Sequence, residues 1–365
     1  LYCLNRKNRT IEENNHIIIQ NDINFFFLNL QKENKVEINK GVVLFAKELI
    51  GNHYDTELTI NKNGKIEKSL ISLNNVSYDL GIIDNKYGDG RLVFDDGKSQ
   101  KLKETDILSL QTESSISNAE LIKTIMESSQ SFSHKTKYSQ EKYIRKKLNK
   151  HHPIFIIHRC TSYYLCYMHY KKSPQKICYL RPDGMAQILY YASINYNSKV
   201  VLFETTQGLM AGAILERLTS DGILLQVYHS SKPIENILDK FKFSYKPTHV
   251  KYDLKNSIEL NSNEYHKTFH CLILVSKYYP LPIVQYLLPL LMPSSPIIIF
   301  FDILQPLLDV YEYLKTTSKG FDLYITDTWF RNIKVQDDST HPEVLMDCQG
   351  GYILRGIIQF YSLHC

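Results

Sequence analysis

From Pro153 onward, short apolar runs alternate with helical segments, and several of the runs are apolar at almost every position. KVVLFE (199–204) and PIIIFF (296–301) lack the alternation of a strand with one solvent face, so they are typical of strands buried on both faces. Strands that alternate with helices predict a doubly wound α/β sheet. We expect strands at 154–158, 163–169, 199–204, 223–229, 269–276, 296–301, 321–330 and 350–360, and helices at 183–193, 208–218, 233–240, 282–291 and 304–316.

The first hundred residues differ, because short apolar runs follow one another between Asn, Gly and Asp turns. The runs at 16–20, 25–30, 42–51, 56–61, 78–84 and 90–97 predict a small β-barrel or sandwich. Ser117 and Glu120 then form a Ser-x-x-Glu capping box that predicts a helix start. We therefore expect a β-barrel domain over 1–112, a helical basic linker over 113–152 and an α/β Rossmann-like domain over 153–365.

Positive charge is concentrated in one segment of the chain. Residues 134–152 contain seven Lys and Arg but one Glu, a local net charge of +6 in a chain whose total is +5. Ile144 and Leu148 mark one face of a helix here, and Lys142 and Lys146 project from roughly the opposite face. A solvated lysine face is one reading; phosphate neutralisation, the main source of nucleic-acid affinity, is the other. The candidate RNA contacts are Lys137, Lys142, Arg145, Lys146, Lys147, Lys150 and, near the end of a later strand, Arg331.

The segment VLFETTQGLMAG (201–212) places an acid, Glu204, at the end of an apolar strand, before a tight turn into a helix. Methyltransferases that use S-adenosylmethionine commonly carry an acid and then Gly-x-Gly-x-Gly at this point. The missing side chains let the backbone approach the ligand closely. Here the three glycine positions hold Thr206, Gly208 and Met210, so we interpret the segment as a degenerate cofactor loop.

Two further features of such a cofactor site are missing. An acid after the next strand would bind ribose hydroxyls, but the run at 223–229 is followed by no carboxylate before Glu235. A polar or acidic group after the strand at 269–276 would hold a target amine, but Ser276 and Lys277 stand there. We therefore expect this chain to bind no cofactor and to contribute no catalytic residue.

Other sites and compartments are constrained by single residue types. The seven cysteines form no Cys-x-x-Cys pair and are odd in number, which argues against a zinc site or a disulfide framework and for a reducing compartment. The histidines lack metal-ligand spacing, so no metal is expected. The apolar stretch 281–301 has the length of a membrane span. Its four prolines favour a helix, a turn and a buried strand, and we expect no membrane association.

Several strings over most of the chain carry a family resemblance. They are DDGKSQKL (95–102), KYSQEKYIRKK (137–147), AQIL (186–189), ETTQGLMAGAILER (204–217), ILVSKYYPLP (273–282) and TWFRNIKV, THP and GGYILRG within 328–356. In this order they resemble the non-catalytic subunit of the eukaryotic tRNA (adenine-N1)-methyltransferase, which modifies a T-loop adenosine. The resemblance extends from about Gly41 to Gly356.

The resemblance implies an N-terminal β-barrel joined to a methyltransferase-like domain that lacks a cofactor site. It also implies a catalytic partner subunit that supplies the S-adenosylmethionine site, a heterotetramer with two copies of each subunit, tRNA bound across subunits, and nuclear localisation. The basic stretch at 141–150 corresponds to one that the family is expected to use on tRNA. Two alternatives stay open: an independent S-adenosylmethionine-dependent RNA methyltransferase with a divergent loop, and an RNA-binding module in translation.

Overall fold

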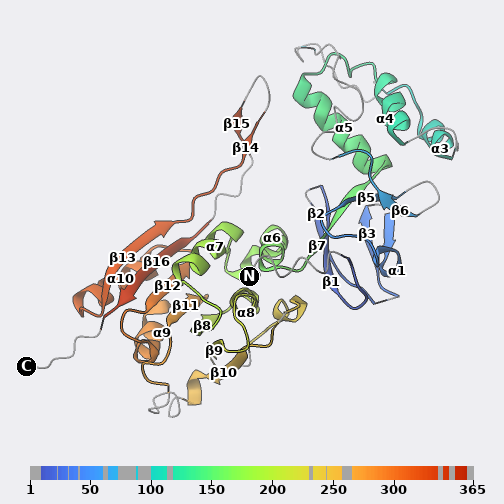
Figure 1. Ribbon diagram of the computed structural model, residues 1–365. Helices are drawn as coiled ribbons and strands as arrows, with labels where there is room; N and C mark the ends of the chain where they lie inside the picture. The colour runs from blue at the N-terminus through green and yellow to red at the C-terminus, as the bar shows by residue number, and fades with distance from the viewer. Residues whose placement is uncertain are drawn as a thin grey trace, which may run out of the picture. The chain divides into compact units, whose positions relative to one another are not determined.

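The computed structural model describes residues 10–22, 24–31, 33–39, 42–60, 65–72, 88, 100–112, 118–229, 233–243, 245–256, 265–335, 340–344 and 350–359. The chain forms two compact units, residues 1–159 and 160–365 (Figure 1). The expected strands at 78–84 and 90–97 lie outside the described residues, as does Ser117 of the expected capping box.

The first unit is built on a five-stranded antiparallel sheet in the order β2-β1-β7-β5-β6. Its strands are β1 (His16–Asn21), β2 (Asn24–Asn29), β5 (Glu57–Ile60), β6 (Ile66–Lys68) and β7 (Ile154–Arg159). The described sheet is open, with β2 and β6 at its edges, so the expected small barrel is not confirmed.

One face of this sheet is covered by a two-stranded ladder and a short helix. The covering elements are β3 (Lys35–Asn39), β4 (Val42–Phe45) and α1 (Ala46–Leu49). Side chains from both layers, among them Ile17, Leu44 and Phe155, share one buried apolar cluster. The expected strand at 42–51 is therefore half strand and half helix, because Ala46 and Leu49 turn inward from a helical backbone.

Three further helices lie among the described residues of the first unit: α3 (Glu104–Thr112), α4 (Asn118–Glu127) and α5 (Lys137–His151). Ile144 and Leu148 of α5 pack with Ile122 and Met126 of α4 and with Ile154 at the start of β7. The basic helix is thus fixed by a buried apolar face.

The boundary between the units lies after Arg159, whereas the sequence predicted it before Pro153. The run 154–158 is a strand, as predicted, but β7 pairs with β1 and β5 of the first sheet. An apolar run reveals a buried strand and carries no information about which sheet it joins. The basic helix therefore belongs to the first unit.

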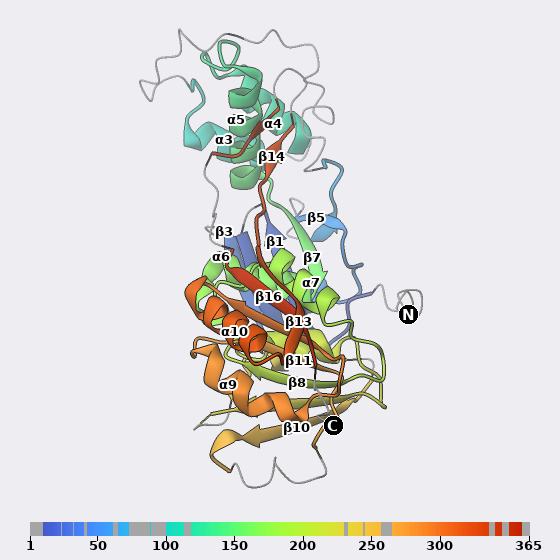
Figure 2. The ribbon, with the colours of Figure 1, turned by 90° about the vertical axis from the view of Figure 1, so that its left-hand side faces the viewer.

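The second unit is a seven-stranded mixed sheet in the order β10-β9-β8-β11-β12-β16-β13. Figure 2 shows these strands stacked from β10 at one edge towards β16 and β13 at the other. The strands from β10 to β12 are parallel, and β16 is antiparallel to both neighbours. The strands are β8 (Lys199–Glu204), β9 (Ile223–Tyr228), β10 (Thr248–Asp253), β11 (Cys271–Val275), β12 (Pro296–Phe301), β13 (Gly320–Asp327) and β16 (Tyr352–Ile358).

Helices cover both faces of this sheet, so the doubly wound prediction is confirmed for the second unit. Residues of α9 and α10 share one buried cluster with alternate residues of the strands, such as Val201 and Phe203. Helices α7 and α8 contact the same strands, and a Cβ added at Gly184 of α7 would touch Phe300 of β12. The helices are α6 (Ser162–Lys172), α7 (Pro182–Tyr191), α8 (Leu209–Leu215), α9 (Pro280–Leu287) and α10 (Gln305–Thr316).

Three elements of the second unit differ from the sequence prediction. The run 163–169 is not a strand but lies within α6, whose N-terminus is capped by the Thr161 hydroxyl. The expected helix at 233–240 shrinks to the 3-10 turn η3 (Leu238–Lys240). Strand β10 was not predicted, because an edge strand with half-exposed residues has no continuous apolar run.

The sheet order changes direction at β8. The chain runs from β8 to β9 on one side, and β11 pairs with β8 on the other. The carboxyl ends of β8 and β11 therefore form a topological switch point, where α/β sheets of this kind bind ligands. Residues 201–212 cross this point.

The described residues include no helix long and apolar enough to cross a membrane. The stretch 281–301 is a helix, a 3-10 turn (η5, Leu288–Leu290) and the buried strand β12, as the prolines predicted. Within the described ranges no three His, Cys, Asp or Glu side chains converge as metal ligands would. Cys160, Cys166, Cys178 and Cys271 are buried thiols.

A buried histidine makes the stability of the first unit depend on pH. His152 is 4% exposed, and its Nδ1 lies 3.3 Å from the Thr59 hydroxyl. Burial lowers the pKa of His152 from 6.5 to about 4, against the opposing influence of Glu67. The unfolded chain therefore takes up this proton first as the pH falls. The stabilisation by neutral His152 is complete above about pH 6.5 and is lost towards pH 4.

Lowering the pH from about 8 to about 5 should reduce the free energy of unfolding of both the wild-type chain and the His152→Leu variant. We expect the reduction to be about 2 kcal/mol larger in the wild-type chain. Leucine fills a similar volume and does not titrate. Urea unfolding of both proteins at the two pH values measures the difference. Burial also lowers the pKa of His169 in the second unit to about 4, but His169 titrates equally in both proteins. An identical loss in the two proteins would therefore show that His152 does not carry the effect.

Candidate functional site

The Glu204 carboxylate lies at the carboxyl end of β8 and is 6% exposed. It accepts hydrogen bonds from the Thr206 hydroxyl, from the Met210 N–H at 3.2 Å and from the Ala211 N–H at 3.0 Å. Gln226 of β9 donates a longer bond, at 3.4 Å. Burial raises the pKa of Glu204, and the hydrogen bonds from Thr206, Ala211 and Met210 oppose that rise.

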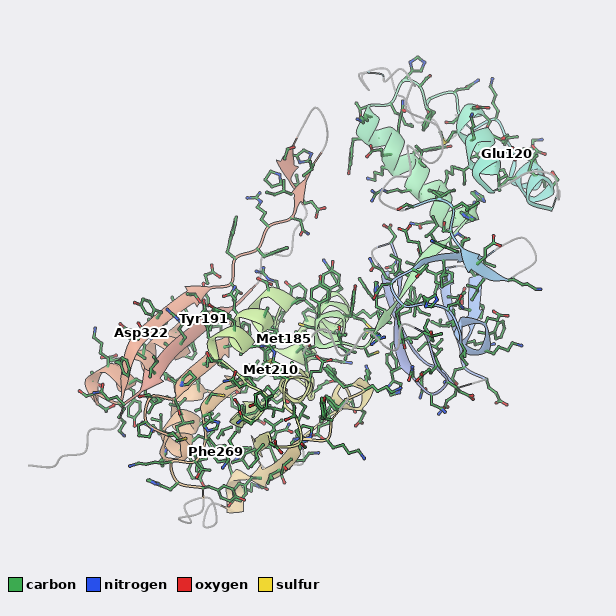
Figure 3. The ribbon with its side chains drawn as sticks, in the orientation of Figure 1. Glu120, Met185, Tyr191, Met210, Phe269 and Asp322 are labelled. Atoms are coloured by element: carbon green, nitrogen blue, oxygen red, sulfur yellow. The ribbon has the colours of Figure 1, made fainter. Side chains whose placement is uncertain are left out.

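The carboxylate thereby caps the first turn of α8. The N–H groups at a helix start have no partner within the helix and form a ready anion site. Here the second and third N–H groups of α8 point to Glu204. Thr206 and Met210, which replace two glycines of the loop pattern, are fully buried. Met210 lies inside the second unit (Figure 3).

The segment 233–241 closes the loop from outside. The Ile237 N–H donates to the Gln207 carbonyl at 3.0 Å. Gly208 has a φ of +84°, and a Cβ added there would lie 2.7 Å from the Leu238 Cβ. A Cβ at Gly212 would lie 2.2 Å from the Phe241 ring. The absence of side chains at Gly208 and Gly212 thus lets Leu238 and Phe241 of the same chain pack against the loop and α8.

Within the part of the chain that the structure describes, no acid stands at the end of β9 to bind ribose hydroxyls. Gln226 of β9 is buried; its amide N–H donates to Glu204, and its Oε1 lies 2.7 Å from His249 Nε2. The Tyr278 ring lies 6.2 Å from Phe203 and 6.3 Å from His229, centroid to centroid. Ser276 bonds the backbone of Tyr278 in both directions, at 3.2 Å. These residues do not fit S-adenosylmethionine, because the loop N–H groups and the close-approach positions are already in use.

The basic helix α5 presents its charges as the sequence predicted. Gln140, Ile144 and Leu148 form its buried face. Lys142, Arg145, Lys146 and Lys150 are exposed, and Lys137 and Lys147 are half-buried. At 100° per residue, Lys142, Lys146 and Lys150 form one row opposite the buried face.

Lys147 stands at the border of this row. Its Nζ lies 5.3 Å from the centroid of the Tyr143 ring. Burial, followed by repulsion from Lys150 and Lys146, lowers the pKa of Lys147. Mutual repulsion of this kind is what a bound polyanion relieves.

Arg331 lies in the second unit, exposed, between β13 and the hairpin strand β14 (Ile333–Lys334), which pairs with β15 (His341–Pro342). Trp329 beside it is 73% exposed, although a large aromatic side chain at a strand end is expected in the core. The sequence also gave no sign of Ile237, Leu238 and Phe241 as the residues that close the loop, because those contacts join segments distant along the chain.

Solved structures support the fold assignment. A tRNA (m1A58) methyltransferase from Aquifex aeolicus superposes with a TM-score of 0.56 at 13% identity, over 96% of this chain and 100% of that one. An S-adenosylmethionine-dependent O-methyltransferase from Thermotoga maritima gives 0.60 at 9% identity, over 98% of each. The chain therefore has a Rossmann-like methyltransferase fold, and its loop at the switch point is closed by its own side chains.

Sequence comparison identifies the family. The sequence model of the Gcd10p family matches residues 10–269, and the chain belongs to this family. It is 27% identical to a tRNA (adenine(58)-N(1))-methyltransferase non-catalytic subunit from Dictyostelium discoideum, over 95% of this chain and 79% of that protein. The subunit of the same name from Mus musculus is 24% identical, over 95% and 88%.

The closed loop predicts a structural role for Gly208. We expect Gly208→Ala to lower the free energy of unfolding by about 2–4 kcal/mol. The added Cβ is strained at a positive φ and also overpacks against Leu238. Gly51→Ala is the matched control: its φ is +90° with no atom within 4 Å of the added Cβ, so only the backbone cost of about 1 kcal/mol applies. Urea unfolding measures both, and equal costs would contradict the packing of Leu238 on the loop.

Proposed function

We propose that the chain is the non-catalytic, tRNA-binding subunit of a tRNA (adenine-N1)-methyltransferase. The observation that carries the proposal is the closed loop at the switch point of a methyltransferase fold, in a member of the Gcd10p family. Its relatives bear the name of that subunit. The catalytic site and S-adenosylmethionine then belong to a partner subunit, and this chain holds no cofactor.

The exposed face of α5 supports the RNA-binding part of the proposal. Four exposed cations on one rigid helix, with Tyr138 42% exposed in the same row, suit contacts to phosphates and a base. Because the opposite face is buried in the first unit, the charges are held in a fixed pattern. Arg331 is proposed as a further phosphate contact on the second unit.

The assembly and its location are part of the same proposal. Two copies of this chain and two of the catalytic subunit form a heterotetramer that acts in the nucleus, and tRNA binds across subunits. An N-terminal β-barrel is proposed on the same family basis.

Transfer of a labelled methyl group from S-adenosylmethionine to an unmodified tRNA transcript tests this function. We expect no transfer by the chain alone and transfer by its complex with the catalytic subunit. S-adenosylmethionine should leave the thermal midpoint of the isolated chain unchanged, since a ligand stabilises only a fold that binds it. Activity or stabilisation of the isolated chain that Glu204→Gln abolishes would favour an independent methyltransferase instead. Purification of the chain on RNA without a methyltransferase partner would favour an RNA-binding module in translation.

Changing Lys142, Arg145, Lys146 and Lys147 to Ala should weaken tRNA binding and flatten its salt dependence. If all four contact phosphates, the slope of log affinity against log salt falls by roughly 3 to 4. A control with the same loss of charge replaces Lys35, Lys68, Lys101 and Lys123, which are exposed elsewhere in the first unit. A filter-binding salt series measures both. Equal slopes for the two variants would remove α5 from the RNA footprint.

A further inference from the structure

A second concentration of positive charge lies on the second unit, at the C-terminal end of α6. His169 and Lys172 belong to the last turn of α6, Lys176 lies in the 3-10 turn η2 (Pro174–Ile177), and Lys240 lies in η3. The Lys240 Nζ is 3.3 Å from His169 Nε2, although the two residues are 71 positions apart. We name these four residues the α6 basic cluster.

The fold brings the cluster together through contacts between short elements. Helix α6 packs against η2 and α8, and α8 contacts η3. Lys172 and Lys176 are exposed, whereas Lys240 and His169 are half-buried. The cluster is therefore a basic surface with two exposed lysines and one half-buried lysine.

Electrostatic repulsion acts within the cluster. The pKa of His169 falls to about 4, through burial first and then through Lys240, Lys176 and Lys172. Neutral His169 thus accepts a hydrogen bond from the Lys240 ammonium. Burial also lowers the pKa of Lys240; Cys160 opposes this, and Lys172 and Lys176 add to it. An anion placed among the three lysines relieves this repulsion.

One acid near Cys160, Glu216, contacts the start of α6. The Glu216 carboxylate accepts the Ser162 N–H, in the first turn of α6, at 3.2 Å. The charge of Glu216 raises the pKa of the Cys160 thiol, and the charge of Lys240 lowers it.

Lys240 is held in place by the segment that closes the degenerate loop. Its N–H donates to the Ile237 carbonyl at 3.1 Å, and Ile237 and Phe241 are both buried. Phe241 packs on Gly212 of α8, and Ile237 bonds Gln207 of the loop. The segment that packs on the degenerate loop therefore also fixes a lysine at the surface.

Another face of α6 carries one exposed and one half-buried aromatic ring. The rings of Tyr163 and Tyr167 stack at 6.1 Å with an angle of 9°, and Tyr163 is 53% exposed. The Lys171 Nζ lies 5.7 Å from the Tyr167 centroid. Aromatic rings beside lysines are typical of surfaces that bind single-stranded nucleic acid, which favours RNA over a small free anion.

We propose that Lys172, Lys176 and Lys240, with His169 orienting Lys240, bind backbone phosphates of the RNA on the second unit. The inference rests on the proposed function and adds to it a phosphate site separate from α5. The methyltransferase-like unit then contributes to RNA binding through the segment that closes its own loop.

The test uses the complex with the catalytic subunit and an unmodified tRNA transcript. We expect the Lys172→Ala, Lys176→Ala, Lys240→Ala triple variant to lower the salt slope of tRNA binding by about 2 to 3. The control replaces Lys255, Lys267 and Lys315, three exposed lysines of the same unit, with the same loss of charge. A triple variant that behaves like this control would overturn the proposal.

Lysine labelling separates the possible ligands. An amine-reactive reagent with mass-spectrometric readout should show tRNA protecting Lys172, Lys176 and Lys240 more than Lys267 and Lys315. Inorganic phosphate alone, at the same phosphate concentration, should not protect them. Equal protection by inorganic phosphate would replace RNA by a small anion as the ligand, and no protection by tRNA would overturn the site.

The companion α5 variant keeps the two proposals distinct. If it lowers the salt slope while the triple variant does not, the α6 basic cluster fails and the proposed function stands. If neither variant differs from its control and the complex transfers no methyl group, the proposed function fails as well.

Discussion

The buried carboxylate of Glu204 is the interaction on which the switch point of the second unit depends. An ionised carboxylate inside a protein is costly unless hydrogen bonds replace its water. Thr206, Met210 and Ala211 provide those bonds. Thr206 departs from the glycine pattern, yet its hydroxyl donates to Glu204. The residues that look like losses from a cofactor loop are thus the residues that hold a closed loop together.

Closure of the loop depends on the path of a second segment of the same unit. The backbone at Gly208 and Gly212 stays close to its neighbours, but the neighbours are now Leu238 and Phe241 of the same chain. The segment 233–241 must therefore keep its path over α8, and that path carries Lys240 to the end of α6. The path of this one segment thus both closes the loop and places Lys240 beside His169.

Much of the local structure could be predicted from the sequence. The parallel strands read as continuous apolar runs because both faces are covered, and α5 showed its buried and charged faces through helical spacing. Predictions from local sequence patterns failed where strand pairing or tertiary contacts determine the structure. The run 163–169 is rich in aromatic residues that favour strands, yet Thr161 caps a helix there. Trp329 stands at the end of a strand and is exposed, although a large aromatic side chain favours burial.

The sequence by itself determined that the loop could not keep a glycine-lined approach, because Thr206 and Met210 carry side chains in any fold. It also determined that one helix would concentrate the positive charge. Only the tertiary structure decided that β7 belongs to the first sheet, that Leu238 and Phe241 fill the space beside the remaining glycines, and that Lys240 meets His169. Side-chain identity fixes local sterics and charge, whereas pairing between distant segments depends on the packing of the whole unit.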